Sequence, residues 1–373
     1  MTVLVVPPLI TLIAADLRLS GTQIGILSGL PIILFGLAAL PGSALIARFG
    51  SLSVLLAGLL IGGVASALRG AMLDVLALYL TTAVMSAGIA IMQAALLPLV
   101  REWLPERVSF ATAVLTNGLL VGEIIPVMLT IPLVLPVVNG SWRAAFALWS
   151  VPMFLIAGLV MAFAPRISKP APAPAPAHWR PNWRSRQIWQ LGILLGSVNS
   201  VYFCSNAFLP GYLTAVGRPD LIGVTLTGLN LGQLPGSIAM LAMSGRLERR
   251  PLPFILSGAG ILLCLAGIVS TAGAWTIVFA SGIGFLAAVV LTLGFALPPL
   301  LSAPRDVART TAAMFTISYS EGLTVSVLSG AAWDIAGNPR FAFVPIAMAA
   351  MPLLLVPPLL RLQRQRSAST TLT

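Results

Sequence analysis

Two carboxylic acids stand out because each lies inside a long apolar stretch of the chain. Glu123 and Glu321 follow two similar turns, Pro105-Glu-Arg-Val108 and Pro304-Arg-Asp-Val307, by nearly the same number of residues. At 1.5 Å per residue, each lies about 21 Å along a helix counted from the valine of its turn. An ionisable group at membrane depth costs at least about 2.5 kcal/mol and is a functional candidate by default. We therefore predict that both bind and release protons; the alternative is a protonated carboxyl that joins two helices for structure alone.

Uncharged polar side chains at helical spacing form a second group of candidates. Asn199, Tyr202 and Asn206 are spaced i, i+3 and i+7, which places them on one face of a helix. Amides can hydrogen-bond a small polar solute without fixing its charge. The alternative is interhelical packing, since such side chains also join membrane helices. The candidates for solute binding share a polar group within an apolar segment and are Asn199, Tyr202, Asn206, Gln93, Asn230 and Gln233.

Composition excludes most kinds of catalytic site. The 373 residues are 58% hydrophobic and 8% charged, against about 25% charged in a soluble globular chain. Two cysteines and one histidine exclude a disulfide scaffold and make a metal site improbable. A phosphate-binding loop needs Gly-x-x-x-x-Gly-Lys-Ser/Thr, and the single lysine, Lys169, has no such context. We predict a membrane protein with no catalytic residues, no metal and no cofactor.

Apolar runs of the length that crosses a bilayer recur along the chain. A spanning helix needs about 20 mostly apolar residues. Twelve such segments are predicted, at 1–17, 21–47, 51–68, 74–98, 108–136, 143–164, 188–215, 220–244, 254–271, 274–300, 310–333 and 341–360.

The basic residues give the predicted orientation. Sixteen of the 21 Lys and Arg residues fall in loops on one side of the predicted membrane, and five, including Arg69 and Arg143, fall on the other. Because short cytoplasmic loops carry the excess of Lys and Arg, both termini are predicted to face the cytoplasm, with the protein in the inner (plasma) membrane. The net charge of +11 is therefore a topology signal, and no nucleic-acid partner is expected.

A change of composition divides the chain into two similar halves. Residues 165–187 contain alternating Pro and Ala, five basic residues and the histidine, which predicts a cytoplasmic linker between bundles at 1–164 and 188–373. Ala95-Leu-Leu-Pro98-Leu recurs as Ala296-Leu-Pro-Pro299-Leu, at an offset of about 200 residues. Two parallel six-helix repeats are typical of many secondary transporters. By the same offset Pro8 matches Pro210, which predicts a first helix shorter than its counterpart.

This organisation resembles the major facilitator superfamily. The loop motif of that family is present in reduced form as Ser43-Ala-Leu-Ile-Ala47-Arg48-Phe-Gly50-Ser, without the family's Asp at position 47 and without a second basic residue near Ser51. The resemblance implies a gating loop at Arg48 and Gly50. It also implies that the first, fourth, seventh and tenth spans line a central cavity.

Within the superfamily the chain resembles the cyanate/2-nitroimidazole permease branch. The matching pieces are Asp16-Leu-Arg-Leu-Ser20, Leu27-Ser-Gly-Leu-Pro31, Ala87-Gly-Ile-Ala90, Leu96-Leu-Pro98, Trp142-Arg143 and Leu209-Pro-Gly-Tyr-Leu213. This resemblance implies a small, often anionic or nitrogen-rich organic solute. The expected function is secondary transport by alternating access, by a monomer in the lipid bilayer, with proton coupling. The competing hypothesis is a membrane receptor or inactive paralogue that binds solute without transporting it.

Overall fold

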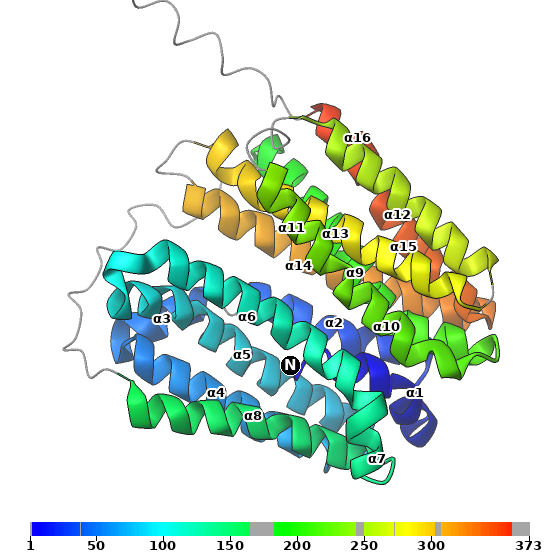
Figure 1. Cartoon of the computed structure of the whole chain (residues 1–373), viewed down its shortest axis with the longest axis horizontal. Helices are drawn as coiled ribbons and strands as arrows, with labels where there is room; N and C mark the ends of the chain where they lie inside the picture. Colours follow the sequence, from blue (N-terminus) through cyan, green and yellow to red (C-terminus); the bar gives the residue numbers. More distant parts are fainter. Residues whose placement is uncertain are drawn as a thin grey trace, which may run out of the picture. The chain divides into compact units, whose positions relative to one another are not determined.

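The regular structure of the chain is helical throughout the part that can be described. The computed structural model describes residues 2–37, 39–164, 183–243, 250–271, 273–302 and 307–359, and no strand occurs among them. Seven helices in these residues are long and apolar enough to cross a membrane: Ser51–Arg69, Val75–Val100, Trp142–Phe163, Arg186–Ala215, Leu252–Ser270, Trp275–Pro298 and Pro339–Leu359. The chain divides into two compact units, Met1–Ala177 and His178–Thr373 (Figure 1).

The N-terminal unit is built from eight labelled α-helices and two short variants. The α-helices are α1 Val6–Leu17, α2 Gly21–Leu37, α3 Ala39–Phe49, α4 Ser51–Arg69, α5 Val75–Trp103, α6 Val108–Leu129, α7 Leu135–Val137 and α8 Trp142–Phe163. A 3₁₀ turn, Pro105–Arg107, precedes α6, and a π-helical turn, Thr130–Val134, joins α6 to α7. Helix α4 packs between α5 and α8, as Figure 1 shows.

The C-terminal unit repeats this pattern with different lengths. Its α-helices are α9 Arg186–Ala215, α10 Ile222–Leu231, α11 Gln233–Met243, α12 Leu252–Ser270, α13 Trp275–Leu301, α14 Val307–Ala336, α15 Phe343–Ala350 and α16 Pro352–Leu355. In the described part of this unit, 3₁₀ turns occur at Pro219–Leu221, Pro339–Ala342 and Pro357–Leu359. Helix α9 packs along α14 and also contacts α13 and α15.

Several predicted spans are single stretches of sequence but not single α-helices. The predicted spans at 108–136, 220–244 and 341–360 are each divided into shorter helical segments. Pro132 lies in the π-helical turn that ends α6, and α10 ends at Leu231 just before Gly232. Proline lacks the N–H that continues a helix, yet membrane helices tolerate such breaks where neighbours satisfy the backbone. Apolar length alone could not locate these breaks.

The first helices of the two predicted repeats differ in length, as the offset of about 200 residues predicts. Helix α1 has 12 residues, whereas α9 has 30 and contains Pro210. The predicted linker at 165–187 lies for the most part outside the described residues, so its bounds stay a prediction.

Close helix contacts depend on glycine. A Cβ atom at Gly58 of α4 would come within 2.6 Å of the Gly88 carbonyl oxygen of α5, and one at Gly88 within 2.8 Å of the Gly62 nitrogen. The two backbones are therefore in direct contact, which is how helices associate in a bilayer that offers no hydrophobic driving force between them.

Candidate functional site

Three of the predicted solute-binding residues meet in one buried hydrogen-bond network of the C-terminal unit. The Tyr202 hydroxyl of α9 donates to Asn230 Oδ1 of α10 at 2.6 Å, and Asn230 Nδ2 donates to Asn206 Oδ1 at 2.9 Å. Asn230 Nδ2 also reaches the Leu226 carbonyl at 2.8 Å, and Asn206 Nδ2 donates to the Tyr202 carbonyl at 3.0 Å. Asn206 and Asn230 are fully buried. We call Tyr202, Asn206 and Asn230 the amide network.

Two other predicted solute-binding residues of this unit are not part of the amide network: Gln233 lies beside it, and Asn199 bonds to a different helix. Gln233 is buried next to it, with its amide nitrogen 3.5 Å from the Asn230 carbonyl, at the outer limit of a hydrogen bond. Asn199 belongs to the same helix but donates to Ser318 Oγ of α14 at 2.8 Å. The predicted stripe on α9 therefore divides between two neighbouring helices.

Glu321 lies one turn along α14 from this Asn199–Ser318 contact. A Cβ atom at Gly196 of α9 would overlap the Glu321 carboxylate, so the carboxyl group rests on bare backbone. The side chain is half-buried.

Glu123, the residue that corresponds to Glu321 in the N-terminal half, has a matching position in its helix. Helix α6 begins at Val108 and α14 at Val307, so Glu123 and Glu321 lie at nearly the same distance from the start of their helices. Glu123 is half-buried and belongs to the N-terminal unit, as does Gln93, which is half-buried on α5. The structure therefore does not place Glu123 or Gln93 within the amide network.

The predicted gating loop joins α3 to α4. Gly50 has φ +85°, a conformation that favours glycine, and its N–H donates to the Ile46 carbonyl at 2.8 Å. Arg48 is exposed, with its guanidinium 5.2 Å from the Phe49 ring centre. Ser51, near which the family carries a second basic residue, donates its hydroxyl to Glu102 Oε1 of α5 at 2.8 Å. This hydrogen bond links the loop to the end of α5.

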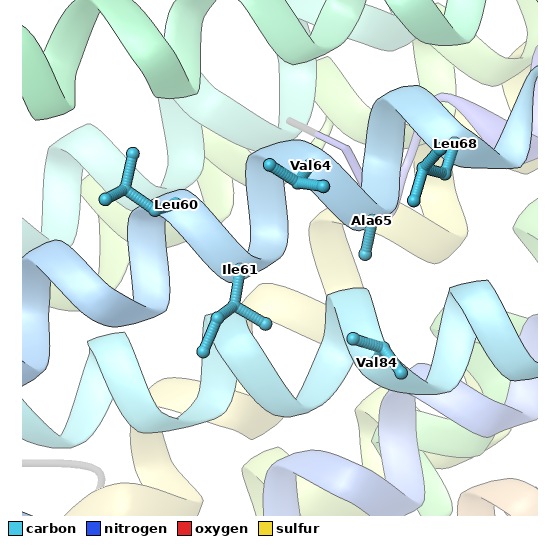
Figure 2. Close-up of a pocket in the computed structure, with 6 residues that line it drawn as sticks. All are labelled: Leu60, Ile61, Val64, Ala65, Leu68 and Val84. Carbon is cyan, nitrogen blue, oxygen red and sulfur yellow. The ribbon is translucent and has the colours of Figure 1, made fainter.

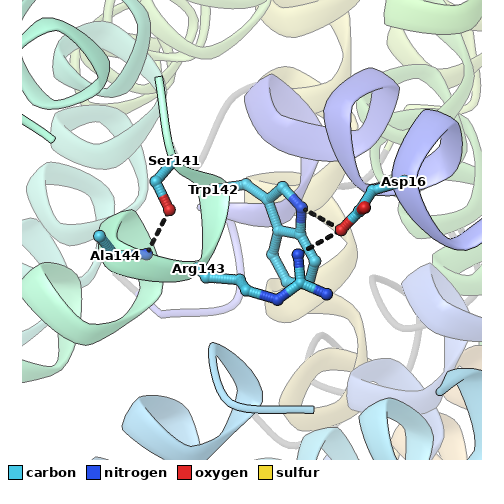
Figure 3. A network of polar contacts seen from close by, with 5 residues as sticks. All are labelled: Asp16, Ser141, Trp142, Arg143 and Ala144. Atoms are coloured by element: carbon cyan, nitrogen blue, oxygen red, sulfur yellow. Dashed lines mark hydrogen bonds and ion pairs between the residues drawn. The ribbon is translucent and has the colours of Figure 1, made fainter. Parts of the chain in front are cut away.

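Two sequence pieces that carried the branch resemblance meet in the structure. Asp16, near the end of α1, accepts a hydrogen bond from Trp142 Nε1 at 3.1 Å and forms an ion pair with Arg143 (Figure 3). The Arg143 guanidinium also lies 4.3 Å from the Trp142 ring centre. Because Trp142 and Arg143 open α8, whose first turn is capped by the Ser141 hydroxyl, this contact ties the end of α1 to the start of α8.

Arg69, which charge counting places in an outer loop, is instead a buried residue of a helix. Arg69 ends α4 and has no exposed surface, although its place after an apolar segment predicted a loop residue. Its Nη1 donates to the Thr2 carbonyl at 3.1 Å and contacts Met85 Sδ at 3.3 Å. A signal was present, because the small residues Gly58, Gly62 and Ser66 recur at helical spacing along the buried face of α4 and the same spacing reaches Arg69.

The N-terminal unit also has an apolar hollow on α4 and α5, with a volume of about 380 Å³. Figure 2 shows its lining side chains, which carry no polar atom: Leu60, Ile61, Val64, Ala65, Leu68 and Val84. Leu60 and Val64 are 41% and 49% exposed. On a membrane helix such a surface suits hydrocarbon chains and offers nothing to a polar solute.

Comparison with known proteins agrees with this all-helical arrangement. The sequence profile of the Major Facilitator Superfamily matches residues 1–368. The chain is 27% identical over 296 residues to an uncharacterised transporter of Bacillus subtilis (strain 168), covering 77% of this chain and 72% of that protein. It is 25% identical over 358 residues to the 2-nitroimidazole transporter of Escherichia coli (strain K12), covering 92% and 87%.

Solved structures show the same fold. A bacterial homologue of the human lysosomal transporter Spinster, in an inward-facing and occupied conformation, aligns with a TM-score of 0.71 at 15% identity, over 96% of this chain and 90% of that one. A mutant of the nucleoside transporter NupG aligns with a TM-score of 0.74 at 11% identity, over 96% of both chains.

The fold and the family match define a class: a multi-helix membrane transporter that acts on a small molecule, not an enzyme. The chain belongs to the major facilitator superfamily. The superfamily resemblance predicted from the loop motif and the repeat is thereby confirmed, and the branch resemblance is supported by the similarity to the 2-nitroimidazole transporter.

Proposed function

We propose that this protein is a proton-coupled secondary transporter of a small, polar, nitrogen-rich or anionic organic solute, working by alternating access. The observation that carries the proposal is the Glu321 carboxyl held against Gly196, one turn from the Asn199–Ser318 hydrogen bond. Intramembrane carboxyls of this kind mark ion and proton pathways. This contact joins a titratable group to a solute-binding candidate on the same pair of helices.

The substrate class follows from the relatives and from the chemistry of the polar residues. The 2-nitroimidazole transporter is similar along nearly the whole chain, and its name gives a small nitro-substituted heterocycle as cargo. Amide and phenol groups such as those of Asn206, Asn230 and Tyr202 suit a polar solute that both donates and accepts hydrogen bonds. We propose that Gln93 contributes the corresponding group from the N-terminal unit and Gln233 a further one from α11.

The proposed topology is twelve spans arranged as two parallel six-helix repeats, acting as a monomer in the inner membrane with both termini cytoplasmic. The excess of basic residues in one set of loops supports the orientation. The repeat supports the division, since Val108 and Val307 begin corresponding helices with Glu123 and Glu321 at matching depth. In this arrangement the loop at Arg48 and Gly50 takes part in gating.

Transport by purified protein in liposomes tests the proposal. Labelled 2-nitroimidazole should exchange across the membrane in a counterflow experiment, and an inward proton gradient should drive its accumulation. For Glu321→Gln we expect counterflow to persist and gradient-driven accumulation to fall at least about tenfold, because exchange needs no net proton movement whereas accumulation does. Glu123→Gln tests the matching residue in the same way.

Glu106→Gln is the matched control, because Glu106 is an exposed acid in the turn before α6 and should leave both readouts unchanged. Unaltered accumulation in Glu123→Gln, Glu321→Gln and the double variant would show that neither acid couples protons. Solute-dependent thermal stabilisation without counterflow would instead identify a solute receptor.

A further inference from the structure

The guanidinium of Arg69 has one side filled and one side open. Nη1 is occupied by the Thr2 carbonyl and Met85 Sδ, and the Cζ atom lies over the Phe146 ring, 4.3 Å from its centre. Nε and Nη2 are buried and have no hydrogen-bond partner among the described residues. The unfilled atoms are thus the two that form one edge of the guanidinium.

The same edge binds a carboxylate elsewhere in this chain. Arg218 donates from Nε to Asp220 Oδ1 at 3.0 Å and from Nη2 to Asp220 Oδ2 at 2.9 Å. This parallel pair of bonds is the geometry by which arginine grips planar anions with two oxygens. Arg69 presents the same two donors, Nε and Nη2, which are buried and have no hydrogen-bond partner among the described residues.

Among the described residues, the groups that bond to or stack on the Arg69 guanidinium are all neutral. A carbonyl oxygen, a thioether sulfur and an aromatic ring stabilise the guanidinium, but none supplies a negative charge. An uncompensated buried cation and buried unsatisfied donors are both costly. The arrangement is therefore incomplete without an anion.

A second unpartnered group lies on the helix that carries Met85. Thr82 precedes Met85 by three residues on α5, which places both on one face of that helix. The Thr82 hydroxyl is fully buried and has no hydrogen-bond partner among the residues described. It can serve an anion as a further donor.

We propose that Arg69 is an anion-binding site of the N-terminal unit, where Nε and Nη2 hold the two oxygens of a small carboxylate and Thr82 supports it. This inference rests on the proposed transport function and names the class of substrate as a small organic carboxylate. Phe146 and the Nη1 contacts fix the plane of the guanidinium, so that its open edge is already oriented for the ligand.

Binding by the purified full-length protein in detergent tests this site independently of transport. The probes are acetate and benzoate, with acetamide and benzamide as neutral counterparts of the same shape. The thermal midpoint of unfolding should rise with the carboxylates and not with the amides. Arg69→Lys keeps the charge but loses the parallel pair of donors, so we expect the apparent affinity for benzoate to fall at least tenfold.

Arg218→Met is the matched control, since its guanidinium edge is already filled by Asp220, and it should bind benzoate like the wild type. Equal stabilisation by carboxylates and amides in the wild type, no stabilisation at all, or full benzoate affinity in Arg69→Lys would each overturn the proposal. If the Arg69 variant does not fold, Thr82→Val takes its place, and unchanged benzoate affinity there would overturn the proposed site.

Failure of this site and failure of the transport proposal are distinguishable. Counterflow of 2-nitroimidazole with no carboxylate binding leaves the transporter and removes the Arg69 site. Carboxylate binding that depends on Arg69, with no counterflow of any probe, leaves the site and removes transport.

Discussion

One buried polar cluster in each compact unit, the amide network and the Arg69 guanidinium, differs from the other in how many of its groups have partners. In the C-terminal unit the amide network is closed: Asn230 donates to Asn206 and to the Leu226 carbonyl and accepts from Tyr202. In the N-terminal unit Arg69 is equally buried, yet two of its donors are unfilled. In the first arrangement each of the three side chains has a hydrogen-bond partner, whereas in the second two donors have none among the described residues.

This difference distinguishes two roles that buried polar side chains can have in a membrane helix. A closed network can hold neighbouring helices in place at little cost in free energy, because each buried donor bonds to another group of the protein. An open cation reduces stability unless a ligand fills it, and natural proteins accept such local costs at functional sites. The amide network is therefore expected to contribute to stability in addition to its proposed role in solute binding, whereas Arg69 is expected to contribute to binding alone.

Breaking the hydrogen bonds of the amide network should have the largest effect on the free energy of unfolding. Asn230→Leu removes the hydrogen bonds that Asn230 makes with the Tyr202 hydroxyl and the Asn206 side-chain oxygen, and we expect it to lower the free energy of unfolding by about 2 kcal/mol. Denaturant unfolding of the purified protein in detergent measures the change. Val224→Leu, on the exposed face of α10, is the control and should stay within about 0.5 kcal/mol of the wild type. A loss below that value for Asn230→Leu would mean that the network does not hold α10 to α9.

Removing the open cation should cost much less. For Arg69→Met without added carboxylate we expect a change of less than about 1 kcal/mol in either direction, because the lost contacts with Thr2 and Phe146 are offset by the removal of an uncompensated buried charge. The same unfolding measurement applies. A loss larger than that of Asn230→Leu would show that Arg69 is a structural residue, and the contrast between the two units would then disappear.

The smallest effect concerns the filled guanidinium of Arg218, which is the exposed counterpart of Arg69. The hydrogen bonds from Arg218 hold the pKa of Asp220 below its usual value. A carboxyl whose pKa is lowered on folding contributes stability above its unfolded pKa of about 3.9 and loses it as the pH falls through the lower, folded value. The difference in thermal midpoint between wild type and Asp220→Asn should therefore be constant from about pH 5 to 7 and shrink as the pH falls below about 4.

This difference should be small because Arg218 and Asp220 are 39% and 60% exposed. A difference that persists unchanged at pH 3 would mean that the pair does not form in solution, and the Arg218 geometry would no longer support the comparison with Arg69.

Much of the helical organisation could be predicted from apolar length. The helices α4, α5, α8, α9, α12 and α13 begin and end within a few residues of the predicted spans, since a bilayer demands apolar runs of that length. The divided spans could not be predicted, because proline and glycine are common within membrane helices whether or not they break them. Charge counting likewise treats every arginine as a loop residue, and for that reason Arg69 was assigned to the outer side.

The sequence by itself determined the class of protein, the polar candidates and the matching positions of Glu123 and Glu321, because these depend on composition and on spacing along one chain. Only the tertiary structure decided which polar groups have partners. Helical spacing gives the face of a helix but not the neighbour that it meets, so Asn199 turning to Ser318, Asn230 closing a network and Arg69 remaining open all depend on how the helices pack.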